Sequence, residues 1–130
     1  MASIRLEMSL CADAAKVWDA VRDVGAIHTR LAPDFVTNVT MEGSARIVTF
    51  ADGRIVKEEI VTVDEDARRL VWSVVGTQMT HHNGSIQVFP DGEACRLIWI
   101  ADILPNDLRD TIAGRMQQGM DAMKRKLEAA

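Results

Sequence analysis

Few side chains of this sequence combine the chemistry and the spacing needed for acid–base work. Glu58 keeps the alternation of Val56 and Ile60, so it shares a face with apolar residues if this stretch is a strand. His82 keeps the alternation of Ile86 and could approach the same region. A buried carboxyl group needs a partner or takes up a proton. A carboxyl and a histidine around one pocket are therefore candidates for a general acid and a general base.

The orientation of these two side chains depends on strand register and stays open. A shift by one residue turns Lys57 and Glu59 inward in place of Glu58. Glu58 and His82 could also be solvated residues or lie at an edge of a sheet. The sequence shows no nucleophile beside a base, and no cysteine or carboxylate stands at metal-ligand spacing from His81 and His82. We therefore expect no metal and no other cofactor.

The stretch Asp107 to Glu128 is the element best suited to position such residues. At helical spacing its apolar residues fall on one face, and its charged and amide residues fall on the other. The apolar face consists of Leu108, Ile112, Met116, Gly119, Met120, Met123 and Leu127. This pattern predicts a long amphipathic helix, capped by Asn106 or Asp107, that lies on another surface.

The preceding chain predicts that surface. Alternation of period two, interrupted by turn residues about every ten positions, indicates seven short strands with two helical segments after the first. The predicted strands are Ile4–Leu10, Val36–Glu42, Ala45–Phe50, Arg54–Val63, Leu70–Val75, Met79–Phe89 and Ala94–Ile103, and the helical segments are Asp13–Asp23 and Ala26–Leu31. The order predicts an α+β fold in which a seven-stranded antiparallel sheet wraps around the C-terminal helix.

Length, charge and cysteine content limit the class of protein. A chain of 130 residues has the size of one domain, residues 1–130. The net charge of −4, with no basic cluster outside the last helical turns, argues against a nucleic-acid partner. We see no signal peptide and no apolar run that could span a membrane, so we expect a cytoplasmic monomer or homodimer. Cys11 and Cys95 are too few for a disulfide scaffold, and we expect two buried thiols.

Several segments together resemble the helix-grip superfamily. They are Ala15–Asp23, Val56–Asp64, Arg69–Val74 and the turn Phe89–Gly92 that leads to Leu97–Trp99. This START-related, or SRPBCC, superfamily includes lipid-transfer domains, plant pathogenesis-related allergens and the bacterial polyketide cyclase/dehydrase group. The similarity extends over essentially the whole chain and its order of elements, and we place the sequence near the polyketide cyclase/dehydrase-like group.

The resemblance implies a cavity between the concave sheet and the long helix. In the match with relatives, Glu58 points into this cavity, and His82 could approach it. Relatives often carry a tryptophan in the second short helix just before its proline. Here Arg30 and His28 occupy this region before Pro33, which implies a more polar entrance to the cavity.

The predicted wall of the cavity is apolar. We expect it to consist of Trp72, Trp99, Met116, Gly119, Met120 and Met123. A glycine in the middle of the helix removes side-chain volume, and methionines adapt to ligands of varied shape. The alternative is that Gly119 only permits close packing of helix and sheet, and that the methionines and indoles are ordinary core.

Three kinds of function are compatible with such a cavity. The first is binding of a small hydrophobic or amphipathic molecule. The second is a cofactor-independent cyclase or dehydratase that acts on an aromatic or polyketide-like substrate, with Glu58 and His82 as acid and base. The third is a protein-interaction domain of co-chaperone type, for which we expect a collapsed cavity and an exposed apolar patch.

Overall fold

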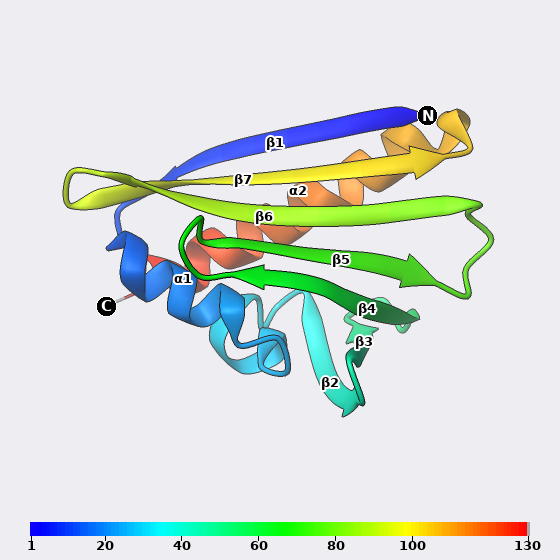
Figure 1. The fold of residues 1–130 in the computed structure, drawn as a ribbon, viewed down its shortest axis with the longest axis horizontal. Helices are drawn as coiled ribbons and strands as arrows, with labels where there is room; N and C mark the ends of the chain where they lie inside the picture. The colour runs from blue at the N-terminus through cyan, green and yellow to red at the C-terminus, as the bar shows by residue number, and fades with distance from the viewer. Residues whose placement is uncertain (130) are drawn as a thin grey trace.

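The structure, a computed structural model that describes residues 1–129, consists of one antiparallel sheet and a long C-terminal helix (Figure 1). The strands are β1 (Ala2–Leu10), β2 (Val36–Glu42), β3 (Ala45–Phe50), β4 (Ile55–Asp64), β5 (Arg69–Val75), β6 (His81–Asp91) and β7 (Ala94–Leu104). The helices are α1 (Ala14–Arg22), the π-helical turn η1 (Ile27–Leu31), the 3-10 turn η2 (Asn106–Leu108) and α2 (Arg109–Leu127). Strand order in the seven-stranded sheet is β1-β7-β6-β5-β4-β3-β2.

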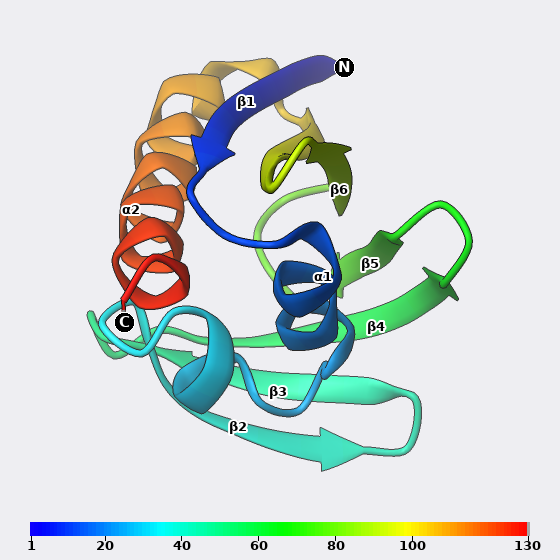
Figure 2. The same ribbon diagram turned by 90° about the vertical axis from the view of Figure 1, so that its left-hand side faces the viewer.

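The sheet curls around α2, as Figure 2 shows, and α1 and η1 close the end of the molecule that faces the viewer. The predicted α+β helix-grip architecture is confirmed, including the two short helical segments after the first strand. Among residues 1–129, no helix is both long enough and apolar enough to cross a membrane.

Two local predictions are wrong. The N-cap of α2 is Leu108, whose side chain makes no capping hydrogen bond, because the chain first makes the 3-10 turn η2 after Pro105. Asn106 and Asp107 therefore do not cap α2. Cys11 is exposed, because it follows the last paired residue of β1, whereas Cys95 in β7 is buried. Both thiols are free.

The core of the described residues consists of three separate clusters. The largest joins α1 to β5, β6 and β7 and includes Trp18, Trp72 and Met123. The second, which contains Met116, joins the start of α2 to β1 and β7. The third, which contains Val48, lies between β2 and β3. Residues of all three clusters surround one cavity, so this cavity occupies the place where the clusters fail to merge.

Candidate ligand-binding cavity

The cavity lies between α2 and the inner face of the sheet and has a volume of about 110 Å³. Its wall includes residues of β3 to β7, of η1 and of α2. An engineered protein cavity of about 150 Å³ holds a benzene molecule, so this volume corresponds to roughly one aromatic ring.

Most of the predicted site residues lie on this wall. They are Glu58, Trp72, His82, Trp99, Met116, Gly119 and Met123. Met120 is buried in the largest core cluster and does not line the cavity. It follows Gly119 by one residue, which turns its side chain by about 100° around the helix axis.

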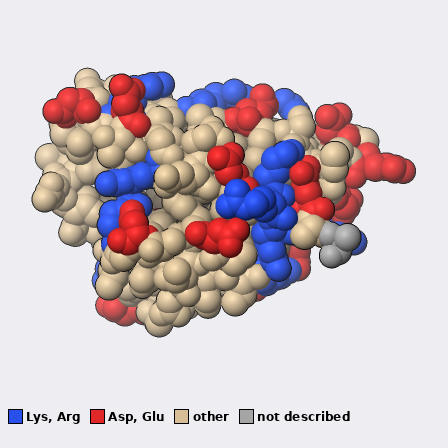
Figure 3. Space-filling model, turned by 180° about the vertical axis from the view of Figure 1, so that it is seen from behind, with Lys and Arg blue, Asp and Glu red and all other residues tan. Residues whose placement is uncertain are grey.

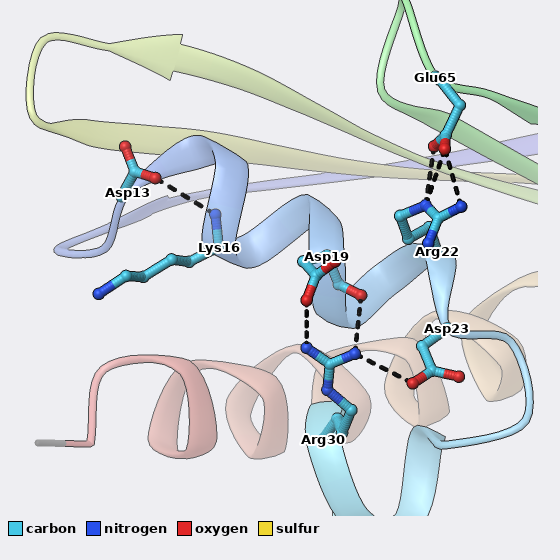
Figure 4. A network of polar contacts seen from close by, with 7 residues as sticks. All are labelled: Asp13, Lys16, Asp19, Arg22, Asp23, Arg30 and Glu65. Carbon is cyan, nitrogen blue, oxygen red and sulfur yellow. Dashed lines mark hydrogen bonds and ion pairs between the residues drawn. The ribbon is translucent and has the colours of Figure 1, made fainter.

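Arg30, which was predicted near the entrance, does not line the cavity. Its guanidinium nitrogens lie 2.6 Å from Oδ2 of Asp19 on α1 and 3.0 Å from Oδ2 of Asp23, the C-cap of that helix (Figure 4). Asp19 and Asp23 stand one helical turn apart, so both carboxylates are presented to the same guanidinium. Arg30 holds the pKa of Asp19 below its usual value through a hydrogen bond and its charge. His28 does not line the cavity either.

Two indoles form part of the cavity wall, and each lies against a glycine. The ring centroids of Trp72 and Trp99 are 6.1 Å apart, with the rings inclined at 57°. A Cβ atom at Gly84, which pairs with Trp72 across the strands, would lie 2.6 Å from Cζ2 of that indole. A Cβ atom at Gly119 would lie 2.9 Å from Cζ3 of Trp99 and 3.0 Å from Cε2 of Phe35. Gly119 thus has both roles considered from the sequence, because it lines the cavity and permits close packing.

A buried ion pair forms part of the same wall. Arg46 and Glu58 are paired across β3 and β4, and Arg46 Nε donates a hydrogen bond of 2.8 Å to Glu58 Oε1. Arg46 also donates to the carbonyl oxygen of Val24 at 3.3 Å. Its guanidinium carbon lies 5.3 Å from the ring centroid of Trp72, within range of a cation–π contact. Sequence reasoning missed Arg46, although the register of the β3–β4 hairpin would have placed it opposite Glu58.

His82 lines the cavity from β6. Burial lowers its pKa, and the charges of His81 and Arg115 lower it further. The ring is therefore neutral at pH 7, because an unperturbed histidine titrates near pH 6.5. Glu58 is two strands away, opposite Val74 of the intervening β5, so about 10 Å separates the two backbones. The two side chains share a face without forming a preassembled acid–base dyad.

The cavity adjoins a polar groove, and the residues that line both mark its mouth. These residues are Phe35, Phe50 and Arg54. The two phenyl rings meet edge to face with centroids 5.1 Å apart, and the Arg54 guanidinium carbon lies 4.6 Å from the Phe50 centroid. Arg54 also pairs with Asp52 at 2.7 Å. Viewed from behind, the surface is hollowed, and both basic and acidic side chains lie beside the hollow (Figure 3).

Two arginines at this end of the cavity, Arg54 and Arg115, were also missed from the sequence. Arg54 begins a predicted strand of ordinary alternation, and Arg115 lies within a predicted helix of ordinary helical periodicity. No local pattern therefore distinguishes either arginine from a solvated residue. Within residues 1–129, no three or more His, Cys, Asp or Glu side chains are grouped so that they could hold a metal ion.

A curled antiparallel sheet that encloses an apolar cavity against one long helix defines a helix-grip protein. The chain belongs to the family described as polyketide cyclase / dehydrase and lipid transport, whose model matches residues 1–128. This assignment confirms the resemblance seen in the sequence. The family and fold support a function in ligand binding or in cyclase/dehydrase-like chemistry. No curated protein matches the chain in sequence.

Solved structures of similar fold come from several organisms. One from Thermobifida fusca is 31% identical, with 95% of this chain and 91% of that chain covered and a TM-score of 0.79. A START superfamily protein from Mycobacterium smegmatis is 12% identical, with 97% of each chain covered and a TM-score of 0.77. Norcoclaurine synthase from Thalictrum flavum is 19% identical, with 95% of this chain and 84% of that chain covered and a TM-score of 0.68.

Proposed function

We propose that this protein binds a small apolar or amphipathic molecule, of about the size of one aromatic ring, in the cavity beneath α2. The observation that carries the proposal is an apolar cavity of about 110 Å³ with a buried ion pair in its wall. Binding sites typically combine such apolar walls with a few fixed polar groups. An open cavity favours this function over the protein-interaction alternative, for which we expected a collapsed one.

The residues of the cavity wall would contribute to binding in different ways. Trp72 and Trp99 provide flat surfaces against which a ring can pack. Met116 and Met123 adapt to its outline, and the absence of a side chain at Gly119 leaves room beside Trp99. Glu58 and His82 are the polar groups that would orient it. The similar norcoclaurine synthase structure contains dopamine and hydroxybenzaldehyde, which are molecules of one ring each.

The three tryptophans allow a direct test. The indole N–H signals of Trp72 and Trp99 should shift in a nuclear magnetic resonance titration with 2-phenylethanol. The signal of Trp18 should stay in place, since its Nε1 donates to Glu65 at 2.8 Å outside the cavity. Shifts spread equally over all three indoles, or no saturable shift, would count against the cavity as a binding site.

A filled cavity should abolish these shifts. Val48 is buried and lines the cavity, so Val48→Phe places a ring in the space that the ligand would occupy. Val39 pairs with Val48 across β2 and β3 and is also buried, but it does not line the cavity. Val39→Phe is therefore the matched control. Overpacking costs each variant about 1–3 kcal/mol of stability, and only Val48→Phe should lose the titration.

A second candidate function is cofactor-independent cyclase or dehydratase chemistry, and the observation that favours it is His82. A neutral imidazole on an apolar cavity wall can accept a proton from a bound substrate. Glu58 is less suited to act as the acid, because one of its oxygens already accepts from Arg46. If the protein is an enzyme, His82→Gln should reduce turnover much more than ligand affinity, while Glu58→Gln should affect affinity and stability together.

A further inference from the structure

We propose that the ligand is an aromatic acid, whose carboxylate binds Arg115 at the mouth of the cavity and whose ring lies inward against Trp72 and Trp99. This inference rests on the proposed binding function and names the class of ligand. It is carried by a cation on the cavity wall that lacks an acidic partner.

The three arginines that line the cavity differ in their partners. Arg46 pairs with Glu58 at 2.8 Å, and Arg54 pairs with Asp52 at 2.7 Å. Arg115 is half-buried on α2, yet among residues 1–129 it forms no ion pair with an Asp or Glu side chain. A partly desolvated guanidinium without a counter-charge is unfavourable, and a ligand carboxylate relieves that cost.

The charge of the cavity wall is opposite in sign to that of the whole protein. Glu58 is the one acidic side chain among the described residues that line the cavity, and Arg46 already neutralises it. His82 is neutral at pH 7, so the wall carries a positive excess. The chain as a whole has a net charge of −4. The excess is therefore local to the cavity, and it favours an anion over a cation of the same shape.

Arg115 lies where it can meet a carboxylate at the mouth. Burial and the charge of His81 lower the pKa of His82, and the charge of Arg115 lowers it further. The pKa of Asp52 is lowered mainly by Arg54, against the opposing effect of burial, and the charge of Arg115 adds to this lowering. Arg115 is thus within electrostatic range of the cavity wall at His82 and of the mouth at Asp52 and Arg54. A carboxylate here can bind the planar guanidinium through two parallel hydrogen bonds.

The volume of the cavity limits the size of the apolar part of the ligand. A volume of about 110 Å³ corresponds to roughly one aromatic ring. With the ring against the indoles and the carboxylate at Arg115, the ligand is a small aromatic acid with one ring. Hydrogen bonds to a charged group typically strengthen binding by about 10- to 100-fold.

The test compares two probes of nearly equal shape, 3-phenylpropionate and 3-phenylpropanamide, which differ in charge. Both are titrated while the indole signals of Trp72 and Trp99 are followed, with Trp18 as the internal reference. We expect the acid to bind the unmodified protein at least about 10-fold more tightly than the amide. Arg115→Gln should remove this preference while amide affinity stays the same. Arg115→Lys should retain only part of it, because an ammonium group keeps the charge but cannot form two parallel hydrogen bonds.

Arg109→Gln is the matched control, because Arg109 lies on the same helix, pairs with exposed Asp110 and does not line the cavity. It makes the same change in net charge and should leave the preference intact. Equal affinity for acid and amide, or an unchanged preference in folded Arg115→Gln, would overturn the aromatic-acid inference while the cavity remains a binding site. If 2-phenylethanol and both probes leave the Trp72 and Trp99 signals unmoved, the binding function itself fails, and the inference with it.

Discussion

The cavity wall and the outer surface of this protein use the same residue types with different consequences. On the surface, Arg30 bridges Asp19 and Asp23, and all three side chains are well exposed to water. On the wall, Arg46 and Glu58 form a pair whose side chains are only 4% and 10% exposed. Water readily replaces a lost partner on the surface but has little access to the buried pair on the wall. Loss of one partner therefore costs more on the wall than on the surface.

The two glycines inside α2 show the same contrast. Gly114 faces open space, and a Cβ atom added there meets nothing within 4 Å. A Cβ atom at Gly119 would collide with Trp99 and Phe35. Position relative to the cavity, rather than residue type or helix membership, therefore decides what a substitution does.

The largest expected effect is the loss of Glu58. Glu58→Ala leaves Arg46 buried without a counter-charge and should lower the free energy of unfolding by about 3–5 kcal/mol. The surface counterpart, Asp19→Ala, should leave the midpoint of urea unfolding nearly unchanged, because its partner Arg30 remains solvated and keeps Asp23.

The double variant Arg46→Met, Glu58→Leu separates burial of charge from loss of packing. Replacement of both partners by apolar side chains of similar size should recover most of the stability lost in Glu58→Ala. Equal losses in Glu58→Ala and Asp19→Ala would remove the distinction between wall and surface.

A smaller difference is expected between the two glycines. Gly114→Ala should raise the free energy of unfolding by about 0.5–1 kcal/mol, because alanine favours a helix and its methyl group meets nothing. Gly119→Ala has the same gain in helix propensity but displaces the rings of Trp99 and Phe35, which costs about 1–3 kcal/mol. Urea titrations of both variants should give changes of opposite sign in the free energy of unfolding. Equal stabilisation of both would show that the Trp99 ring can move aside at no energetic cost.

The smallest expected effect is a pH dependence at His82. Because its pKa is lowered in the folded state, the unfolded chain takes up this proton first as the pH falls below about 6.5. The stability associated with neutral His82 is therefore complete above this pH and is lost as the pH falls toward the folded pKa. Urea unfolding between pH 8 and pH 5 should show a shallower decline in His82→Gln than in the unmodified protein. Parallel curves would mean that burial of the ring has no energetic consequence.

Much of the fold and part of the site follow from local patterns. The bounds of β2 and β3 agree with the predicted strands, and the other elements differ by a few residues at their ends. The inward orientation of Trp72 and Trp99 follows from their phase with Leu70 and Leu97. Alternation along a strand is a property of the backbone, so it can be read without knowledge of what lies opposite.

Other parts of the site depend on residues that are distant in the sequence. The pairing of Arg46 with Glu58 needs the register of two strands. Arg30 pairs with Asp19 of α1 and with its C-cap Asp23 and does not line the cavity. Arg115 fits the helical periodicity of α2, so the sequence does not single it out. Only the folded molecule shows that, among residues 1–129, it lines the cavity without an acidic partner. The sequence by itself determined the sheet, the long helix and the inward phase of Trp72 and Trp99, whereas the orientation of Glu58 needed the strand register. The open cavity, its size and the charge on its wall were decided by tertiary packing, because a void exists only where side chains from separate elements fail to fill the space between them.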